Sequence, residues 1–503
     1  MIRVRQGLRL LLTPLAATIP VSAAVARPAP VVAVTGGRVV GMNDGQGLLF
    51  LGLPFAAPPV AERRWRPPAP VIPWHGLRDA TRVRPSCPQN DEGWNRADAL
   101  RGDEDCLTLD LHTPGLRGRR PVMVWIHGGS NRAGSGAGVV RSALARRGIV
   151  LVSVQYRLGV LGFLSHRGLV AEQGGHAGNY GLMDQIAALR WVRANIARFG
   201  GDPAQVTLFG ESAGAQDVSL LLAAPAARGL FRAAVLQSGT PGFGMPFRAL
   251  SEAVAIGDQL DRLSGGGGDL ERLRQLPVSS LLALQQKLGE PATRGNDFLF
   301  LRTTIDGAVL PAPPDRLWAV RRRLPVVIGT NRVEFGPAPG TVDPVPFARF
   351  WLGSDADRLL AAYRDELAAG REPRRGPLEL RMQSDAQFHC PANRLARALT
   401  GLGWPVWRYE FDQPVGTDGL TAHAHELAYL FEGRRVAGGV RLQDYWVALA
   451  RWRDPNGRLQ GADRPAWPQV DDGRPVTLRF DPDATRLAPG LPRDAFCAAT
   501  VRY

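Results

Sequence analysis

Short, mostly apolar runs recur along the chain, and longer stretches with helical spacing lie between them. A short apolar run is typical of a strand that is buried on both faces of a sheet. Such runs predict strands at residues 122–126, 149–154, 206–209, 233–237 and 326–328. Residues 182–199 repeat apolar side chains at helical spacing and end at a Gly-Gly pair, which predicts a helix.

The order of these elements predicts the fold class. Strands that alternate with helices indicate an α/β fold, in which a mostly parallel central sheet has helices on both faces. Residues 406–411 alternate in polarity, so we expect this strand nearer the edge of the sheet. Residues 243–324 and 344–400 have helical patterns, with a break at the glycines of 265–268. No linker-like composition or repeat interrupts the chain, and residues 27–503 are expected to form one domain.

Composition and charge exclude several classes of protein. Of the 503 residues, 45% are hydrophobic and 21% are charged, which suits a large core and excludes disordered and multi-pass membrane proteins. The formal net charge of +15 comes from arginine, because Lys287 is the only lysine, and the arginines are spread from end to end. Nucleic-acid-binding proteins gather basic residues on one face or in a known motif. We therefore expect no nucleic-acid partner.

The N-terminus has the pattern of an export signal, which we assign to residues 1–26. Three arginines precede an apolar stretch at 10–25, and Ala24-Val25-Ala26 matches a small-residue cleavage site. Two prolines interrupt the stretch, which is too short for a bilayer-spanning helix, so stable membrane insertion is not expected. The pattern predicts a secreted or periplasmic protein; the alternative is an N-terminal helix of the fold.

The cysteine content suits an oxidising compartment. An even set of four cysteines supports two disulfides. These residues are Cys87, Cys106, Cys390 and Cys497. Spacing favours Cys87 with Cys106 and Cys390 with Cys497, although four cysteines allow three pairings. The chain has no C-x-x-C pattern, so neither a zinc site nor thioredoxin-type chemistry is expected.

A candidate nucleophile follows the predicted strand at 206–209. Gly210-Glu-Ser-Ala-Gly214 comes directly after this strand and opens a helix-compatible run, which is the context in which G-x-S-x-G positions a reactive serine. Glycines flank the serine because a sharp strand-to-helix turn leaves no room for a Cβ atom. The pattern predicts that Ser212 stands at the start of a helix, whose dipole favours a developing negative charge.

A serine hydroxyl needs an adjacent base, and in this type of fold the order along the chain is serine, acid, histidine. His389, His423 and His425 are the histidines that follow Ser212. Because His389 adjoins Cys390, a disulfide would restrict it. His423 and His425 follow the strand predicted at 406–411, so either of them is a candidate base.

Two carboxylates are candidates for the group that orients the histidine. Glu334 follows the predicted strand at 326–328 and a short turn, which is the position that a triad acid occupies. Asp306 is the competitor, but Asp306-Gly307 is typical of a turn. The alternative to a catalytic role is that Glu334 is a solvated loop residue that forms a salt bridge with an arginine.

A glycine pair follows the predicted strand at 122–126. His127-Gly-Gly-Ser130 would bring backbone amides close to a substrate, as the oxyanion hole of an acyl-transfer enzyme requires. We expect the N–H groups of Gly128 and Gly129 to act together with that of Ala213.

These motifs resemble those of the type-B carboxylesterase family, which also contains the cholinesterases. The resemblance extends from about residue 34 to the C-terminus and includes further matching segments. They are Phe50-Leu-Gly-Leu-Pro-Phe-Ala56, Glu104-Asp-Cys-Leu-Thr-Leu109, Asn179-Tyr-Gly-Leu-Met-Asp-Gln185, Phe199-Gly-Gly-Asp-Pro203, Thr304-Ile-Asp-Gly307 and Asp454-Pro-Asn456. The resemblance implies an α/β-hydrolase fold, a triad of Ser212, Glu334 and His423, and the cysteine pairing that spacing favours.

The sequence departs from the family pattern at three places. The acid motif reads Val-Glu-Phe where the family usually has Asp-Glu-Gly. Ala424 replaces a usual glycine after the histidine, and Ser130 stands in the hole motif where glycine or alanine is commoner. None of these changes removes a catalytic group, but each one alters the surroundings of the pocket.

The motifs, the resemblance and the export signal together predict a secreted serine esterase that cleaves carboxylic esters through an acyl-enzyme and needs no metal or organic cofactor. Its partner would be a small-molecule ester. A non-catalytic interaction protein on the same fold is one alternative, and an acyltransferase or amidase that uses the same triad is another. Trp94, which lies between Cys87 and Cys106, either lines the substrate pocket or packs in the interior.

Overall fold

We describe the protein from a computed structural model. The structure describes residues 29–293, 298–334, 340, 342–415, 419–458, 464–471 and 473–498. The expected signal at 1–26 therefore lies outside the described residues.

The described residues form strands along the whole length of the chain. They are β1 Val31–Val34, β2 Gly37–Val40, β3 Met42–Asn43, β4 Leu48–Pro54, β5 Leu77–Asp79, β6 Thr108–Thr113, β7 Arg120–Ile126, β8 Val150–Val154, β9 Gly201–Glu211, β10 Ala233–Gln237, β11 Arg248–Ala249, β12 Thr304–Ile305, β13 Val326–Asn331, β14 Val406–Phe411, β15 Val476–Phe480 and β16 Thr485–Pro489.

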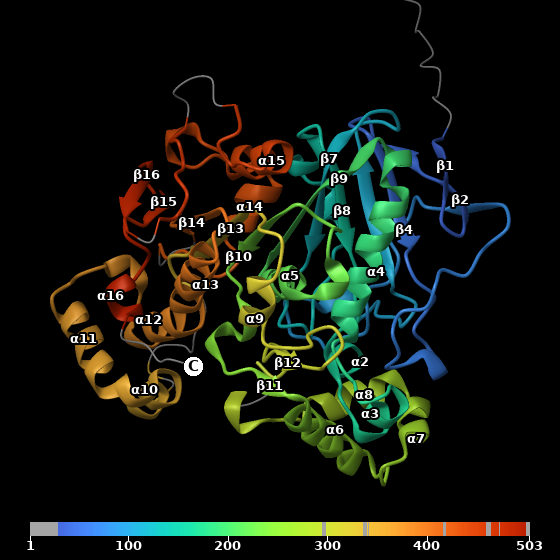
Figure 1. The fold of residues 1–503 in the computed structure, drawn as a ribbon, viewed down its shortest axis with the longest axis horizontal. Coiled ribbons are helices and arrows are strands. Elements are labelled where there is room, and N and C mark those ends of the chain that lie inside the picture. The colour runs from blue at the N-terminus through green and yellow to red at the C-terminus, as the bar shows by residue number, and fades with distance from the viewer. Residues whose placement is uncertain are drawn as a thin grey trace, which may run out of the picture.

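The α-helices surround these strands (Figure 1). They are α1 Arg96–Ala99, α2 Gly159–Phe163, α3 Arg167–Glu172, α4 Tyr180–Asn195, α5 Ala213–Ala223, α6 Leu250–Ser264, α7 Leu270–Gln275, α8 Val278–Gln285, α9 Pro314–Ala319, α10 Pro344–Leu352, α11 Ala356–Ala368, α12 Leu378–Ser384, α13 Cys390–Gly401, α14 Glu426–Phe431, α15 Leu442–Trp452 and α16 Asp494–Cys497.

An 11-stranded sheet forms the centre of the molecule, with the order β16-β15-β14-β13-β10-β9-β7-β8-β6-β4-β3. The strands from β8 through β7, β9, β10, β13 and β14 to β15 are parallel. Antiparallel strands complete both sides, with β6, β4 and β3 next to β8 and β16 next to β15. This arrangement confirms the mostly parallel sheet that the sequence predicts.

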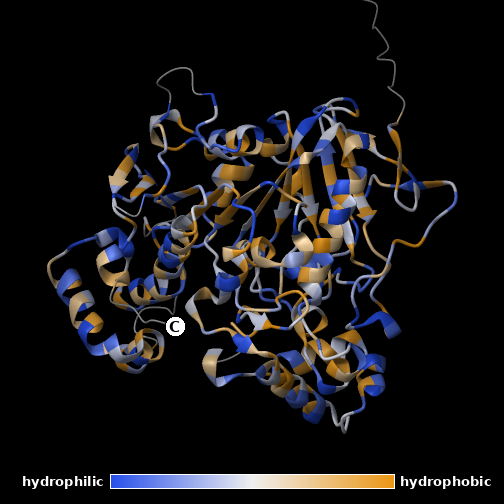
Figure 2. Ribbon diagram, viewed as in Figure 1, coloured by the Kyte–Doolittle hydropathy of each residue, from blue (hydrophilic) through white to orange (hydrophobic). Residues whose placement is uncertain are grey.

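Helices cover both faces of the sheet, and each face has its own core. One core joins side chains of α4, α5 and α13 to the sheet, and the other joins α14 and α15 to the opposite face. Figure 2 shows the hydrophobic residues concentrated in the central strands and on the helix sides that meet them. Two groups of helices, α6–α8 and α10–α12, extend away from the sheet (Figure 1). They correspond to the helical stretches predicted at 243–324 and 344–400.

Residues 406–411 form β14, as predicted, and β14 lies nearer an edge of the sheet than the other strands predicted from the sequence. It is not an edge strand, because it lies between β13 and β15 and all its residues are buried. The polar side chains that make the strand alternate are Arg408 and Glu410, which are 0% and 2% exposed. Alternation usually indicates a solvated face, but here Glu410 pairs with Arg332 and Arg375, and the Arg408 guanidinium donates to the hydroxyl of Thr330 at 2.9 Å.

Candidate active site

The predicted site residues gather at one end of the parallel strands. Ser212 follows β9 directly, Glu334 follows β13 after a short turn, and His423 lies in the segment between β14 and α14. Since β9, β10, β13 and β14 are adjacent and parallel, their carboxyl ends meet at the same edge of the sheet. This edge is where open α/β sheets bind their ligands.

Ser212 occupies a strained turn between β9 and α5. Its φ of 55° and ψ of −125° lie outside the regions that residues other than glycine normally occupy. The flanking glycines are required by contact, because a Cβ on Gly210 would lie 2.5 Å from the carbonyl carbon of Gly214. A Cβ on Gly214 would lie 2.1 Å from the carbonyl oxygen of Ile126. The backbone thus has the geometry that the G-x-S-x-G pattern predicts.

His423 and Glu334 meet, although 89 positions separate them in the chain. Nδ1 of His423 lies 2.6 Å from Oε2 of Glu334, and the backbone N–H of His423 also donates to the Glu334 carbonyl, at 3.3 Å. The Glu334 side chain is completely enclosed, whereas the imidazole keeps 17% of its surface exposed. A buried carboxylate on Nδ1 leaves Nε2 of the ring directed at other groups.

Two further groups hold Glu334. Its Oε1 accepts hydrogen bonds from the Ser238 hydroxyl and from the Asn331 backbone, both at 2.8 Å. Burial raises the pKa of Glu334 to about 8, and these two hydrogen bonds act in the opposite direction. The sequence analysis missed both partners. Ser238 had a usable signal, because it is the polar residue that follows β10, the strand between β9 and β13.

The competing residues lie elsewhere. His425 accepts a hydrogen bond from the backbone of Ala422 at 2.9 Å and helps to form the turn. His389 is buried and contacts the hydroxyl of Thr330 at 3.1 Å. Asp306 accepts from the backbone amides of Val309 and Leu310, as expected for the turn at Asp306-Gly307.

Among the described residues, Ser212 and His423 form no hydrogen bond with each other. Nε2 of His423 instead lies 3.1 Å from Oε1 of Glu211, the residue directly before Ser212. Catalytic hydrogen bonds are often long without substrate and tighten when it binds. Burial raises the pKa of Glu211 to about 8; Glu426 and Glu334 act in the same direction, and His423 opposes them.

The glycine loop after β7 lies against Ser212. A Cβ on Gly128 would be 3.0 Å from Cβ of Ser212, so only glycine fits there. Among the described residues, the backbone N–H groups of Gly128, Gly129, Ser130 and Ala213 have no hydrogen-bond acceptor. Amides without an acceptor beside a serine are what an oxyanion hole requires. Ser130 has a φ of 57°, which explains why glycine would be easier to accommodate at this position.

Buried polar groups that the sequence analysis missed support this loop. Asn131, which also has a positive φ of 54°, donates from its side chain to Oδ1 of Asp217 at 3.0 Å. Its carbonyl accepts from the backbone N–H of Gly159 at 2.7 Å. Burial raises the pKa of Asp217 to about 7, against hydrogen bonds from Asn131 and Gln185. Asp217 follows the nucleophile motif by only a few residues, but nothing in the sequence indicates that it faces this loop.

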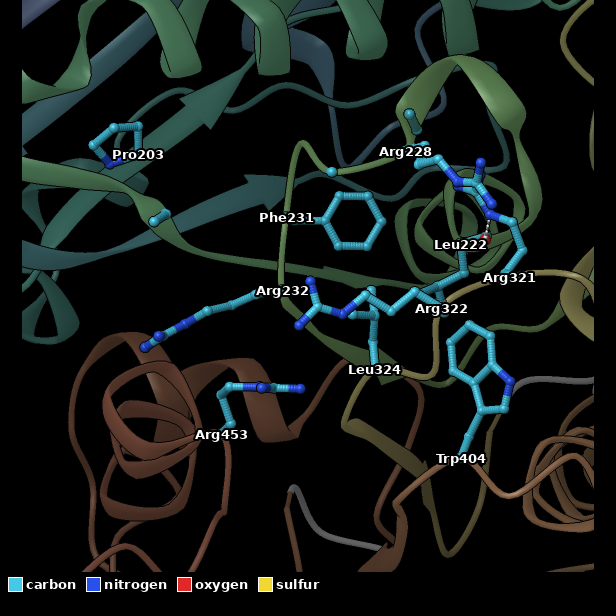
Figure 3. A pocket seen from close by; sticks show the side chains of 13 residues that line it. Pro203, Leu222, Arg228, Phe231, Arg232, Arg321, Arg322, Leu324, Trp404 and Arg453 are labelled. Carbon is cyan, nitrogen blue, oxygen red and sulfur yellow. Dashed lines mark hydrogen bonds between the residues drawn. The ribbon is translucent and has the colours of Figure 1, made fainter.

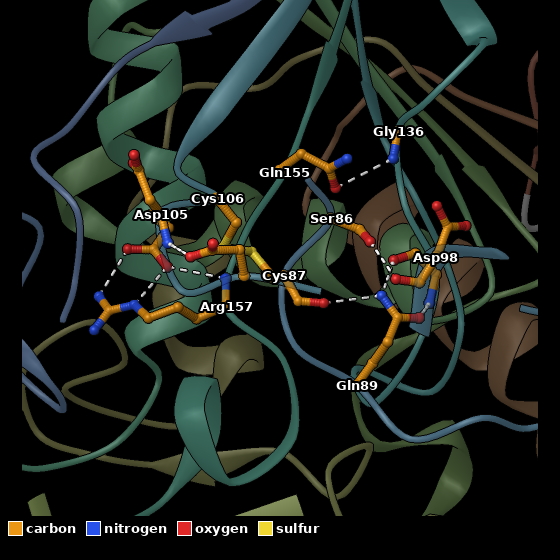
Figure 4. Close-up of a disulfide and its surroundings, with 12 residues drawn as sticks. Ser86, Cys87, Gln89, Asp98, Asp105, Cys106, Gly136, Gln155 and Arg157 are labelled. Atoms are coloured by element: carbon orange, nitrogen blue, oxygen red, sulfur yellow. Dashed lines mark hydrogen bonds and ion pairs between the residues drawn. A yellow bond between two sulfur atoms is a disulfide. The ribbon is translucent and has the colours of Figure 1, made fainter. Parts of the chain in front are cut away.

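The two disulfides follow the pairing that spacing favours. The structure joins Cys87 to Cys106 and Cys390 to Cys497. Figure 4 shows the first disulfide beside Arg157, whose guanidinium pairs with the buried carboxylate of Asp184 at 2.7 Å.

Trp94 lies in the segment between Cys87 and Cys106, beside the glycine loop. Its side chain is 67% exposed, so the alternative of interior packing is wrong. A Cβ on Gly129 would lie 3.1 Å from the edge of its ring. The indole is therefore available to a molecule that approaches the glycine loop.

The described residues contain neither a metal-site cluster nor a membrane-spanning helix. No group of three or more histidine, cysteine, aspartate or glutamate side chains in this part of the chain has the arrangement of a metal site. Among the helices described, none is both long and apolar enough to cross a membrane.

Comparison with known proteins decides the family. The sequence model of the carboxylesterase family matches residues 28–342. The chain belongs to this family. Fumonisin B1 esterase of Sphingopyxis macrogoltabida is 36% identical over 430 residues, which cover 83% of this chain and 77% of that protein. Para-nitrobenzyl esterase of Bacillus subtilis is 32% identical over 476 residues, which cover 89% and 94%.

Solved structures agree with this assignment. A PNB esterase superposes with a TM-score of 0.78 at 27% identity and covers 95% of this carboxylesterase and all of its own chain. A carboxylesterase of Geobacillus stearothermophilus gives a TM-score of 0.72 at 31% identity, with coverage of 94% and 100%. The α/β-hydrolase fold predicted from the sequence is confirmed. The carboxylesterase is a carboxylic ester hydrolase with small-molecule ester substrates, which speaks against the non-catalytic alternative.

Proposed function

We propose that this carboxylesterase is an exported serine esterase that hydrolyses its substrate through an acyl-enzyme, with Ser212 as nucleophile, His423 as base and Glu334 as orienting acid. The observation that carries the proposal is the 2.6 Å contact between Nδ1 of His423 and Oε2 of Glu334 at the edge of the sheet where the strained Ser212 turn also lies. Residues from three distant segments have little reason to converge in this way unless they act together.

In the proposed mechanism, Ser212 attacks the ester carbonyl while His423 accepts the serine proton. The N–H groups of Gly128, Gly129 and Ala213 bind the oxyanion of the tetrahedral intermediate; losing one such donor typically costs about 3 kcal/mol of transition-state stabilisation. His423 then donates its proton to the leaving alcohol. Water attacks the acyl-Ser212 ester in the second half, again with His423 as base, and the acid product leaves. Glu334 stabilises the imidazolium in both halves.

Export is the second part of the proposal. Disulfides form and persist in oxidising compartments, and two of them join this chain. The signal-like pattern at residues 1–26 agrees with this location.

The nucleophile is tested with p-nitrophenyl acetate and an organophosphate. The wild type should give a burst of p-nitrophenol and gain one phosphoryl adduct on Ser212, detected by peptide mass spectrometry. Ser212→Ala should lose both the burst and the adduct, whereas Ser142→Ala, a change at a half-buried serine outside the site, should keep them. A burst that persists in Ser212→Ala would refute the assignment.

The same assay separates hydrolysis from the remaining alternatives. Product analysis with added alcohols and with matched amides reports acyl transfer and amide cleavage. Hydrolysis of the ester that is faster than either one supports the esterase, and a dominant transfer product would favour an acyltransferase.

A further inference from the structure

A cavity lies at the other end of the parallel strands from the candidate active site. Its volume is about 560 Å³ (Figure 3). It is lined by Pro203 at the start of β9, Arg232 before β10, Leu324 before β13 and Trp404 before β14. Ser212 lies nine positions after Pro203 along β9, which separates the two ends by about 30 Å, because a strand rises about 3.3 Å per residue. The cavity is therefore distinct from the candidate active site.

Five arginines line this cavity, and no aspartate or glutamate does. They are Arg228, Arg232, Arg321, Arg322 and Arg453. Within the described part of the chain, none of the five lies within ion-pair distance of a carboxylate. Several enclosed arginines elsewhere in the molecule do have such partners, as Arg157 has in Asp184 and Arg248 has in Glu290. The cavity therefore concentrates positive charge that the protein itself does not neutralise.

The arginines are close enough to repel one another. Burial, together with the charge of Arg453, lowers the pKa of Arg232. Burial, together with Arg228, likewise lowers the pKa of Arg321. Figure 3 shows the side chain of Arg322 between these two pairs. Asp202 acts in the opposite direction on the pKa of Arg232, but it already binds Arg119 at 3.1 Å and Gln205 at 3.0 Å.

Helix capping explains two of the five arginines. Arg321 donates to the carbonyls of Leu222 and Ala224 at the end of α5, at 3.2 and 2.9 Å. Arg232 donates to the carbonyl of Ala450 near the end of α15, at 2.6 Å. Such contacts at helix C-termini are favourable. They also hold both guanidinium groups in place before any ligand arrives.

Capping does not explain the other three arginines. Among the described residues, no side chain of Arg228, Arg322 or Arg453 donates a hydrogen bond to the protein, so these three arginines cap no helix. The Nε atoms of Arg232 and Arg453 are buried without a hydrogen-bond partner in the same part of the chain. Buried donors without partners usually indicate a missing acceptor.

The remaining walls are apolar. Phe231, Leu222 and Trp404 are almost fully buried and face the cavity, which also contacts Leu324. A concave, partly apolar space of this volume with a few convergent polar groups is typical of a small-molecule site. Guanidinium groups match phosphate oxygens in paired hydrogen bonds.

We propose that this cavity binds a small organic molecule with two or more phosphate groups. A phosphate monoester carries a charge of about −1.5 to −2, so two or three of them balance five arginines. The two arginine pairs each receive one phosphate, and the apolar wall of Phe231 and Trp404 receives the organic part. The proposal does not depend on the function of the candidate active site.

Isothermal titration calorimetry of the full chain tests the proposal, with ATP, pyrophosphate and orthophosphate as probes. ATP should bind more tightly than pyrophosphate because it also contacts the apolar wall. Orthophosphate should bind at least tenfold more weakly than pyrophosphate, because the loss of one charge-assisted hydrogen bond costs about a factor of ten in affinity. The double variant Arg228→Gln/Arg322→Gln should lose about 100-fold in ATP affinity, since each arginine accounts for about tenfold. Both arginines are exposed, which limits the effect on folding.

The matched control removes the same charge elsewhere. Arg262→Gln/Arg272→Gln changes two exposed arginines on α6 and α7 and should leave ATP affinity unchanged. Turnover of p-nitrophenyl acetate by both double variants checks that they fold. An equal loss in both double variants would assign binding to the overall charge and overturn the proposal. Absence of ATP binding at millimolar concentration, or binding of heparin that ATP does not displace, would overturn it as well.

Discussion

Glu334 is bound by three partners, and this makes its replacement informative. Glu334→Gln keeps the size of the side chain but removes its charge, and its amide can donate to Nδ1 of His423, which then adopts the wrong tautomer. We expect kcat for p-nitrophenyl acetate to fall by about 10⁴-fold with little change in KM, as for the loss of a triad acid elsewhere. Steady-state kinetics of the purified variant measure both values.

Asp306 supplies the control for this prediction, because it is the competing candidate for the acid of the triad. It accepts two backbone hydrogen bonds and has no contact with His423, so Asp306→Asn should lower stability and leave kcat near the wild-type value. A collapse of kcat in Asp306→Asn with normal turnover in Glu334→Gln would reverse the assignment.

Ala424 carries strain directly beside His423. Its φ of 66° lies in the left-handed region, which costs a residue with a Cβ atom about 1–2 kcal/mol. Ala424→Gly should therefore raise the free energy of unfolding by about 1 kcal/mol, measured as a higher denaturant midpoint. Ala422→Gly is the matched control, because Ala422 has no positive φ, and this change should lower stability by about 0.5–1 kcal/mol. Destabilisation by both glycines would contradict the left-handed conformation of Ala424.

At the scale of elements, the parallel centre of the sheet was predictable and its sides were not. β7, β8, β9, β10 and β13 each contain a mostly apolar run because both faces of the sheet are covered, and these runs are visible in the sequence. The antiparallel strands β3 and β16 are short and partly exposed, so their patterns do not stand out from those of loops. Their pairing depends on distant partners, which no local pattern records.

The same distinction applies to the candidate site. Ser212 lies in a local motif, and Glu334 follows a recognisable strand, so both could be proposed from short segments. Residues alone left His423 and His425 as alternatives, and only the tertiary structure brings His423 to Glu334. Glu211 was visible in the motif, but its contact with the imidazole requires the fold.

Glu410 on β14 links several elements behind the site. Its carboxylate pairs with Arg332 after β13 at 3.1 Å, with Arg375 at 2.7 Å and with Arg479 on β15 at 3.4 Å. Burial alone would raise the pKa of Glu410, but Arg375 and Arg332 lower it well below its usual range. Glu410→Gln removes the carboxylate that these arginines share, although Glu372, Asp412 and Asp481 still pair with them. It should therefore cost less than about 3–5 kcal/mol of stability, the range typical of breaking an isolated buried ion pair.

The lowered pKa also determines the effect of pH. A lowered native pKa gives stability that is fully present above the unfolded pKa of about 4.3 and is lost as the pH falls toward the native value. Below pH 4.3 the wild type should therefore lose more stability per pH unit than Glu410→Gln, by up to about 1.4 kcal/mol, in urea unfolding at a series of pH values. Glu432→Gln, at an exposed glutamate, should follow the wild type. Parallel curves for all three proteins would contradict the prediction.

At the scale of the whole molecule, the sheet combines both halves of the chain. β3 and β4 from the N-terminal part and β15 and β16 from the C-terminal part lie at opposite sides of one sheet, and the parallel strands between them come from the middle. The carboxyl ends of those middle strands form the candidate active site, and their amino ends border the arginine-lined cavity. Two sites thus share the same strands without sharing residues.

This continuity leads us to propose that residues 27–503 unfold as one domain, and the Cys390–Cys497 disulfide offers a test. It joins residues 107 positions apart, so its loss should cost about 4–5 kcal/mol in the chain-entropy model, against about 3 kcal/mol for Cys87–Cys106, which are 19 apart. If the chain unfolds as one domain, replacing Cys390 and Cys497 by serine should shift the whole calorimetric transition to lower temperature, and the Cys87 and Cys106 pair should shift it less. A transition that splits in two, with one part unmoved, would show that the C-terminal strands and helices unfold independently, because only a separate domain can lose its own constraint without weakening the rest.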